Sequence, residues 1–175
     1  MTIQQKQCLL CYLGLYNGAI DGIWGPKSAN AEAQFRQNQG LSPTEALESA
    51  LLDAIRPEEN HWWDAVPHFR KEEFACKCGQ FCDGYPAEPD KILVEAAEKV
   101  RNHFASPVLI SSGLRCQTHN KNVGGAAKSR HLSGKAMDFR VQSRNAQEVL
   151  SFVKTLPEIR YCYAINSQYV HMDVD

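Results

Sequence analysis

Apolar side chains recur at helical spacing in the first 55 residues of the chain. Residues 3–14 form one such stretch, and a second helix is expected from Pro26 to Asn38 because proline suits the first turn of a helix. A third helix is expected over residues 44–55, where four apolar side chains share one face (Leu47, Leu51, Leu52 and Ile55). The pattern predicts a small three-helix domain at residues 1–55, and a unit of about 55 residues buries only a small core by itself.

A polar stretch separates this unit from the remainder of the chain. Arg56 to His61 contains a proline and charged residues, so residues 56–68 are predicted to be an interdomain linker. Trp62 and Trp63 follow directly, and we interpret this pair as packing between the two units. A sugar-stacking surface is the alternative for the two indole rings.

Helical and strand-like stretches are mixed in residues 69–175. Helices are expected over residues 88–104 and 144–156, where apolar side chains recur three or four positions apart. Strand-like runs are expected at residues 107–111, 137–141, 160–165 and 169–174, with Asn166-Ser167 as a hairpin turn between the last two. The mixed order of helices and strands along the chain, with a hairpin at its end, predicts the α+β class, with a mainly antiparallel sheet flanked by helices.

Composition and charge disfavour some classes of protein. The 175 residues are 43% hydrophobic and 22% charged, as in an ordinary globular chain. The formal net charge of −1 offers no basic footprint for nucleic acid, and no apolar stretch approaches the roughly 20 residues that span a bilayer. We therefore expect neither a nucleic-acid nor a membrane partner, and we expect a monomer.

Seven cysteines mean that at least one is unpaired within a monomer. Cys76, Cys78 and Cys82 are clustered, which is compatible with a second metal site or with a structural loop that holds one disulfide or free thiols. No other cysteine or histidine cluster of standard spacing completes a set of four ligands, so the structural loop is favoured. Cys116 could pair with one member of the cluster. The other three are interpreted as buried apolar positions (Cys8, Cys11 and Cys162).

Two histidines and an aspartate are candidate metal ligands. His131 and Asp138 lie seven positions apart, and small residues between them (Ser133, Gly134 and Ala136) let the backbone turn closely around a metal. His171 lies in a strand-like run, where residues 169, 171 and 173 share one face. Zinc accepts imidazole nitrogen and carboxylate oxygen together, and three protein ligands with one open position are typical of a catalytic site. The pair alone is a weak signal, because a surface histidine with an unrelated aspartate nearby is common.

A longer motif around these ligands resembles that of a known family. It runs through five segments of the sequence: Ser112-Gly-Leu-Arg115-Cys, His119-Asn120, Val123-Gly-Gly125, Ser129-x-His131-x-x-Gly134-x-Ala136-x-Asp138 and Val170-His171-x-Asp173. Over residues 62–175 the chain resembles the zinc D-Ala-D-Ala carboxypeptidases and related phage and bacterial peptidoglycan peptidases, the group named for lysostaphin, D-Ala-D-Ala peptidases and hedgehog. The resemblance implies one zinc ion per chain, held by His131, Asp138 and His171, with bacterial peptidoglycan as the partner.

The N-terminal helices resemble the three-helix peptidoglycan-binding module found beside many wall hydrolases. Three short segments carry this resemblance: Leu13-Gly14-Leu-Tyr16-Asn-Gly18, Asp21-Gly22-x-x-Gly25-Pro26 and Phe35-Arg-Gln37. It implies that residues 1–55 bind peptidoglycan and that residues 69–175 form the zinc peptidase domain. The alternative is that the helices only brace the catalytic domain.

Further site residues follow from the needs of peptide hydrolysis and from the resemblance. Arg115 is expected to bind a substrate carboxylate or to stabilise the oxyanion, with a structural salt bridge as the alternative. Asn120 and Ser129 match family positions that line the site, although either could only hold a loop. Tyr169 is also expected to contact the substrate.

The general base is not evident from the sequence. Related enzymes place an acid three residues before the last zinc histidine or a histidine two residues before it, and Gln168 and Tyr169 occupy those positions here. Neither side chain is a good base at neutral pH. Asp173 shares a strand face with His171, and is expected either to accept the proton of the attacking water or to orient a zinc histidine. His119 is a lesser candidate for the base.

These features predict a zinc-dependent peptidase that hydrolyses peptide bonds in peptidoglycan stem peptides or cross-links, as a carboxypeptidase or as an endopeptidase of the endolysin type. The alternative is a non-catalytic wall-binding protein that retains the zinc fold, and the missing acid at Gln168 favours it. Residues 1–8 lack a charged start followed by an apolar core, so no secretory signal is expected. To act at the cell wall, the protein would then have to be released in the manner of a phage lysin, or have lost a signal that was removed earlier.

Overall fold

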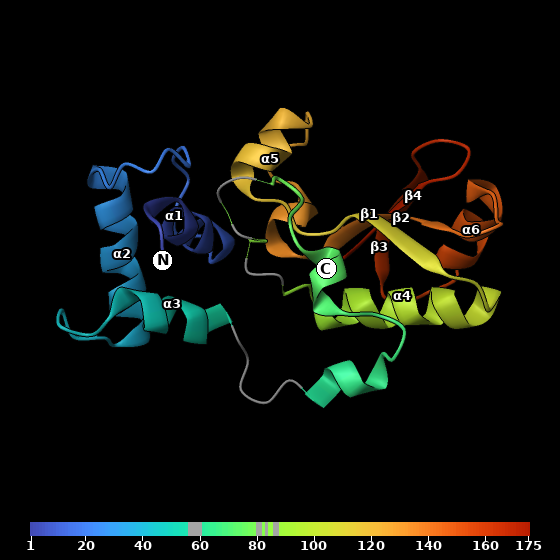
Figure 1. The fold of residues 1–175 in the computed structure, drawn as a ribbon, viewed down its shortest axis with the longest axis horizontal. Helices are drawn as coiled ribbons and strands as arrows, with labels where there is room; N and C mark the ends of the chain where they lie inside the picture. The colour runs from blue at the N-terminus through green and yellow to red at the C-terminus, as the bar shows by residue number, and fades with distance from the viewer. Residues whose placement is uncertain (56–60, 80–81, 83, 86–87) are drawn as a thin grey trace.

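The computed structural model of the chain describes residues 1–55, 61–79, 82, 84–85 and 88–175 (Figure 1). The N-terminal part contains α1 (Ile3–Tyr12), α2 (Pro26–Gln39) and α3 (Leu47–Ile55). Short 3-10 helices, η1 (His61–Ala65) and η2 (Lys71–Phe74), lead into the C-terminal part. The elements of that part are, in chain order, α4 (Lys91–Phe104), β1 (Val108–Ser112), α5 (Gln117–Asn122), η3 (Arg130–Ser133), β2 (Ala136–Val141), α6 (Ala146–Val153), β3 (Ile159–Ala164) and β4 (Val170–Val174). None of the helices among the described residues is long and apolar enough to cross a membrane.

Local sequence signals set the ends of the N-terminal helices. Thr2 caps α1: its hydroxyl accepts from the backbone of Gln5, whose side chain accepts from the backbone of Thr2 in return. Pro26 lies in the first turn of α2, and Gly40 ends that helix in the left-handed conformation (φ 67°). The predicted helices are thus present, and they enclose a small core of their own (Leu9, Leu10, Tyr16, Ala31, Phe35, Leu51 and Ile55).

An antiparallel sheet with strand order β1-β2-β4-β3 forms the centre of the C-terminal part (Figure 1). Alternate side chains of its strands point to opposite faces. One face is apolar and packs against α4 and α6, and together they form the main core (Met137, Phe139, Val141, Val170, Met172 and Val174 from the sheet; Leu93, Ala97, Val100, Val149 and Val153 from the helices). The predicted α+β class with an antiparallel sheet is therefore confirmed.

The opposite face of the two central strands carries polar side chains. β2 and β4 pair in a register that sets Asp138 opposite His171 and Ala136 opposite Asp173. The strand alternation that buries the apolar side chains against the helices also turns these polar residues to the other side. Two of the three predicted metal ligands consequently share one face of the sheet.

Most of the predicted elements begin and end within a few residues of their expected bounds, including the hairpin between β3 and β4. The Asn166 side chain closes its turn by accepting from the backbone nitrogens of Gln168 and Tyr169, both at 2.9 Å. The hydrophobic pattern does not predict α5 or η3, because elements of six and four residues are too short to show a period.

The predicted linker is only partly described. Residues 56–60 lie outside the described residues, and residues 61–65 form η1. Trp62 and Trp63 stack with ring centroids 4.3 Å apart and pack against the core of the C-terminal part. Packing is therefore favoured over a sugar-stacking surface for this pair, and its packing partner is the C-terminal core.

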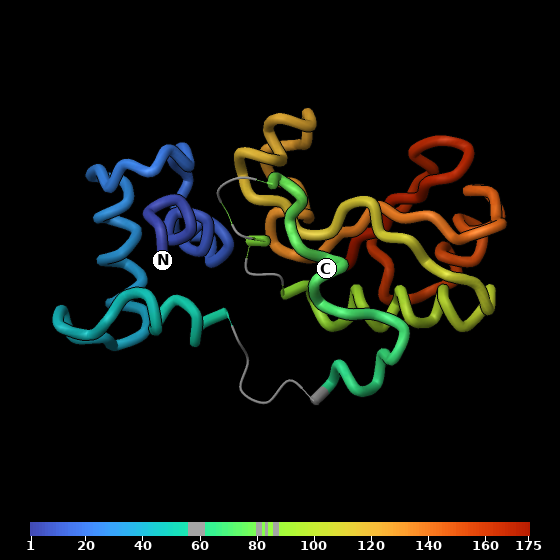
Figure 2. The backbone as a smooth tube through the Cα atoms, in the orientation of Figure 1, coloured from blue at the N-terminus to red at the C-terminus, as the bar shows by residue number. Residues whose placement is uncertain are grey.

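Helix α1 brings the N-terminal helices into contact with the C-terminal part (Figure 2). The Tyr12 hydroxyl donates to the carbonyl oxygen of Glu88 (3.2 Å), and the Tyr12 ring meets Tyr85 edge to face with centroids 6.0 Å apart. Cys8 of α1 is buried in a small cluster whose other members belong to the C-terminal part. The two parts are thus packed together through α1 and through Ile20 of the loop that follows it.

Candidate metal centre

Asp138 and His171 face each other across two neighbouring strands. β2 and β4 are antiparallel, and their register pairs these two residues directly. The Asp138 Oδ1 lies 2.7 Å from the His171 Nδ1. Because the ladder of backbone hydrogen bonds fixes both Cα atoms, the two side chains meet without depending on a loop.

His131 reaches the same point from the turn before β2. It lies in η3, which Gly134 ends in the left-handed conformation (φ 72°). His131 is 2% exposed, its Nδ1 lies 2.6 Å from the Gly113 carbonyl oxygen, and its Nε2 lies 3.3 Å from the Asp138 Oδ1. A carbonyl oxygen can only accept, so in the neutral ring Nδ1 carries the proton and Nε2 turns its lone pair toward Asp138.

Gly113 holds this histidine at a point where the chain tolerates no side chain. A Cβ at position 113 would meet the carbonyl oxygen of Phe74 at 2.5 Å, closer than real Cβ contacts. The backbone nitrogen of Leu114 donates to the same oxygen (2.7 Å). The loop after β1 is therefore pressed against η2, which fixes the carbonyl that receives the His131 proton. The sequence motif contains Gly113, but its role as the partner of His131 appears only in the structure.

The three predicted ligands converge. One nitrogen of each histidine and a carboxylate oxygen of Asp138 lie within 4.8 Å of one another. Burial alone would raise the pKa of Asp138, but the neighbouring His131 and His171 side chains and the charge of Arg115 lower that pKa below its ordinary range. The carboxylate is therefore ionised at neutral pH. Two imidazole nitrogens and a carboxylate are donors that zinc accepts, so these residues fit the predicted metal.

Arg115 lies beside the same carboxylate. Its Nη2 donates to the Asp138 Oδ2, its Nε donates to the Ser112 Oγ (2.7 Å), and its backbone nitrogen donates to the His131 carbonyl oxygen (2.9 Å). The salt bridge considered for Arg115 is therefore present, with Asp138 as the partner. The same contacts bring the guanidinium next to the predicted ligands, within reach of a group bound there.

Asp173 lies behind His171 and is buried. Its Oδ2 lies 2.8 Å from an Arg160 guanidinium nitrogen and 3.5 Å from the His171 Nε2. Its Oδ1 has no hydrogen-bond partner among the described residues. The carboxylate is thus paired with a cation, and it faces the histidine nitrogen that points away from Asp138.

Tyr163 is a neighbour of the site that the sequence pattern does not single out. It pairs with His171 across β3 and β4, and its ring stacks on the imidazole with centroids 4.9 Å apart. Burial, followed by the negative charge of Asp138, raises the pKa of Tyr163, so the phenol is protonated at neutral pH. Strand alternation and the hairpin register are the signals in the sequence that could have found it.

The predicted substrate-binding residues Asn120, Ser129 and Tyr169 differ in their contacts. Asn120 is buried and its amide donates to the Ala126 carbonyl oxygen (2.8 Å), which favours a loop-holding role. Ser129 is half-buried and lies two residues before His131. Tyr169 is half-buried and directly precedes β4. Ser129 and Tyr169 therefore flank elements that carry the ligands, and contact with substrate stays a prediction for all three residues.

Two comparisons with known proteins bear on this site. Residues 67–173, more than half of the chain, match the model of a protein family described as Peptidase M15. A stretch of 126 residues is 27% identical to the zinc D-Ala-D-Ala carboxypeptidase of Streptomyces albus G. The aligned part covers 69% of this chain and 49% of the relative, so the chain spans about half the length of that curated protein. All the residues of the candidate metal centre lie within the range that the family model matches.

Proposed function

The chain belongs to the peptidase M15 family, and from this premise we propose that it is a zinc-dependent peptidase acting on the peptides of bacterial peptidoglycan. The observation that carries the proposal is the convergence of His131, Asp138 and His171 within the part that the family model matches. Similarity to a zinc D-Ala-D-Ala carboxypeptidase supports zinc as the ion and peptides that contain D-Ala as the substrate class.

The proposed ion would be held by His131 through Nε2, by His171 through Nδ1 and by the Asp138 carboxylate. These are the atoms that face one another. When bound in such a site, zinc lowers the pKa of a water molecule to about 7 and polarises a carbonyl group. The chain itself sets the donors: the Gly113 carbonyl fixes the tautomer of His131, and the surrounding charges keep Asp138 ionised.

Arg115 is proposed to bind the substrate. Its guanidinium has five N–H donors, and among the described residues it donates to Ser112 and Asp138. Its other donors can hold a peptide carboxylate, or the carbonyl oxygen on which negative charge grows. A terminal carboxylate at Arg115 would suit a carboxypeptidase, and an internal carbonyl would suit an endopeptidase.

Asp173 is proposed to orient His171, in preference to acting as the general base. The His171 Nε2 faces Asp173 while its Nδ1 faces Asp138, which is the arrangement in which a carboxylate fixes a metal-binding histidine. The Asp173 Oδ2 is already engaged by the Arg160 guanidinium at 2.8 Å, which leaves this oxygen less free to take up the proton of a water molecule. The base role remains the alternative, and it predicts a different response to the Asp173→Asn substitution.

One observation favours a second function, a wall-binding protein without catalysis. Gln168 occupies the position three residues before His171, where an acid is expected in an active peptidase, and a glutamine side chain cannot accept a proton at neutral pH. Gln168 lies exposed in the turn between β3 and β4. A protein that only binds the wall would need no base at this position.

Residues 1–55 are proposed to bind peptidoglycan and to hold residues 69–175, the peptidase domain, at an insoluble substrate. The helices have their own core and carry a groove of about 350 Å³ along α3 and the turn that joins it to the end of α2 (Gln39, Leu41, Glu45, Ala46, Ser49, Ala50, Asp53 and Ala54). Tethering of this kind raises the effective concentration of substrate without altering the active site. The contacts of Tyr12 with Glu88 and Tyr85 support the bracing alternative, and one unit can do both.

Purified peptidoglycan provides the test of the proposed activity. The protein should release new amino groups from the isolated wall, and a chelator or the His131→Ala substitution should abolish that release. Soluble peptides that end in D-Ala-D-Ala then distinguish a carboxypeptidase from an endopeptidase, because a carboxypeptidase liberates D-Ala from them and an endopeptidase does not. Binding to the wall without release of amino groups would favour the non-catalytic alternative.

A further inference from the structure

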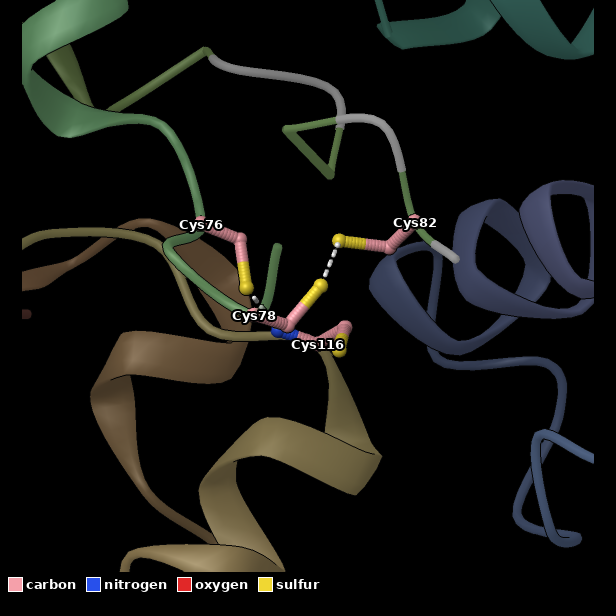
Figure 3. A group of neighbouring side chains, drawn as sticks. All are labelled: Cys76, Cys78, Cys82 and Cys116. Atoms are coloured by element: carbon pink, nitrogen blue, oxygen red, sulfur yellow. Dashed lines mark hydrogen bonds between the residues drawn. The ribbon is translucent and has the colours of Figure 1, made fainter. Parts of the chain in front are cut away.

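Four cysteines from two separate segments meet in one place (Figure 3). Cys76, Cys78 and Cys82 come from the segment between η2 and α4, and Cys116 comes from the turn between β1 and α5. One sulfur atom from each lies within 4.8 Å of all the others. In the sequence only three of them are clustered, and Cys116, 34 positions after Cys82, is suggested there only as a partner for one member of the cluster.

The spacing of these sulfurs is close to that of a tetrahedral metal site. Zinc–sulfur bonds of about 2.3 Å set neighbouring sulfurs of a tetrahedral site roughly 3.8 Å apart. The Cys78 and Cys82 sulfurs are 3.1 Å apart, beyond the length of about 2.05 Å that a disulfide bond requires. A single ion could therefore bridge all four sulfurs with small side-chain shifts.

Two of the sulfurs accept hydrogen bonds from the backbone. The backbone nitrogen of Cys116 donates to the Cys76 Sγ (3.3 Å), and the backbone nitrogen of His119 donates to the Cys116 Sγ (3.4 Å). Hydrogen bonds of this kind favour the thiolate, which is the form of cysteine that binds metals. Buried cysteines often serve only as small apolar side chains, but that role does not require four of them to converge.

We propose that Cys76, Cys78, Cys82 and Cys116 form a structural zinc site that is separate from the candidate catalytic centre. Four thiolates complete a tetrahedral shell without an open position, which is typical of structural zinc. Each thiol releases its proton to solvent as its sulfur binds the ion. The inference goes beyond the proposed peptidase activity and does not depend on it.

The ion would hold an irregular segment against the loop that carries Arg115. Between η2 and α4 the described residues form no helix or strand, and the segment closes on itself where the Cys76 nitrogen donates to the Gly84 carbonyl oxygen (2.9 Å). Cys116 directly follows Arg115 in the sequence. A bound ion would therefore fix the backbone from which the guanidinium reaches Asp138.

Cys8 of α1 is a further thiol in the same buried cluster of side chains. Among the described residues, its sulfur does not belong to the group that lies within 4.8 Å, so we assign Cys8 to packing. Cys162 is half-buried on β3 and packs against the main core, outside the cluster. Like Cys78 it is half-buried, so it provides a matched control for substitution.

Elemental analysis of the whole chain, purified under reducing conditions without a chelator, tests the site. The unmodified protein should carry two zinc ions per chain, and Cys78→Ser and His131→Ala should each carry one. The control Cys162→Ser should keep both. If the catalytic centre did not bind zinc but the cysteine site did, the unmodified chain would carry one ion, and Cys78→Ser would carry none. The assignment of the catalytic centre and that of the cysteine site can therefore be refuted separately.

Cobalt gives a readout that can be taken on the unmodified chain. When loaded with Co²⁺, the unmodified chain and His131→Ala should both show the intense near-ultraviolet absorption of cobalt–thiolate bonds. The absence of that absorption would overturn the proposal, as would a Cys78–Cys82 disulfide found by mass spectrometry of the alkylated protein. Loss of zinc in Cys8→Ser together with its retention in Cys78→Ser would overturn the assigned set of ligands.

Discussion

The two candidate metal sites of this chain are built in opposite ways. The histidine–aspartate site takes two ligands from neighbouring strands in fixed register and the third from a turn that Gly134 ends. The cysteine cluster takes three of its four thiols from a segment whose described residues form no helix or strand. Geometry at the first site follows from the fold, whereas at the second site a bound ion would itself hold the fold.

The two sites also differ in their donor atoms. Two imidazoles and a carboxylate leave room for water and substrate at a metal, while four thiolates leave none. Removal of metal from the sheet site should therefore stop chemistry and leave the sheet in place. Removal from the cysteine cluster should loosen the segment next to Arg115.

Arg115 lies between the two sites, and its substitution should have the largest effect. Arg115→Ala should keep the zinc at the sheet site, because Arg115 is not a ligand, but turnover should fall about 100-fold or more, as is typical when a donor to the developing oxyanion is lost. Kinetics on peptidoglycan fragments and elemental analysis measure the two quantities. Arg144→Ala, which removes an exposed arginine from the start of the α6 region, is the control and should leave both unchanged. Normal turnover in Arg115→Ala would leave the residue with only its salt bridge to Asp138.

Asp173→Asn tests how the sheet site holds its histidines. If Asp173 orients His171, the zinc affinity should fall about 10–100-fold, because a partner of a metal-binding histidine is weakened. Titration with a competing chelator measures this affinity. If Asp173 is instead the general base, turnover should collapse at an unchanged zinc affinity, and the acidic limb of the pH–rate profile should move or disappear. Normal affinity and normal turnover together would remove Asp173 from the mechanism.

Gly113→Ala tests whether the sheet site also depends on the loop beside it. The added Cβ would meet the Phe74 carbonyl oxygen at 2.5 Å, so backbone must shift, and we expect the free energy of unfolding to fall by about 1–3 kcal/mol. The shift should also weaken zinc binding, because the Gly113 carbonyl fixes His131. Gly25→Ala is the control, since a Cβ there meets nothing within 4 Å. Chemical denaturation compares the two variants, and equal stability would contradict the close packing of the loop.

The smallest effect is expected at the N-terminal groove. Ser49→Trp places a large ring in the groove along α3, and should weaken co-sedimentation with purified peptidoglycan several-fold while turnover of a small soluble peptide is unchanged. Ser151→Trp, at an exposed position of α6, is the control. Unchanged co-sedimentation of the Ser49 variant would indicate that this groove does not bind the wall, and would favour the bracing role.

The sequence predicted those features that depend on a local repeat of apolar side chains or on a long motif. Alternation along β2 and β4 is enough to place Asp138 and His171 each on the polar face of its strand, and the motif indicated that they act together with His131. Helices long enough to show an apolar stripe were predicted for the same reason. The short elements α5 and η3 were not predicted, because elements of six and four residues are too short to show a hydrophobic period.

Contacts between distant segments could not be predicted in this way. Cys116 joins the other three cysteines only because the turn after β1 packs against the segment after η2. The stacking of Tyr163 on His171 and the pairing of Arg160 with Asp173 depend on the register of the β3–β4 hairpin. The two hairpin contacts follow from a register that alternation could in principle indicate, whereas the position of Cys116 is set by tertiary packing, on which composition and spacing give no information.

The central claim is that the sheet site binds a zinc ion on which peptide hydrolysis depends. The most direct measurement is the release of amino groups from purified peptidoglycan while zinc is titrated into metal-stripped protein. Release should be absent from the stripped protein, should return as zinc is added, and should not return in His131→Ala at any zinc concentration. A folded, unmodified chain that binds zinc and releases no amino groups would contradict the claim, and would indicate a wall-binding protein instead.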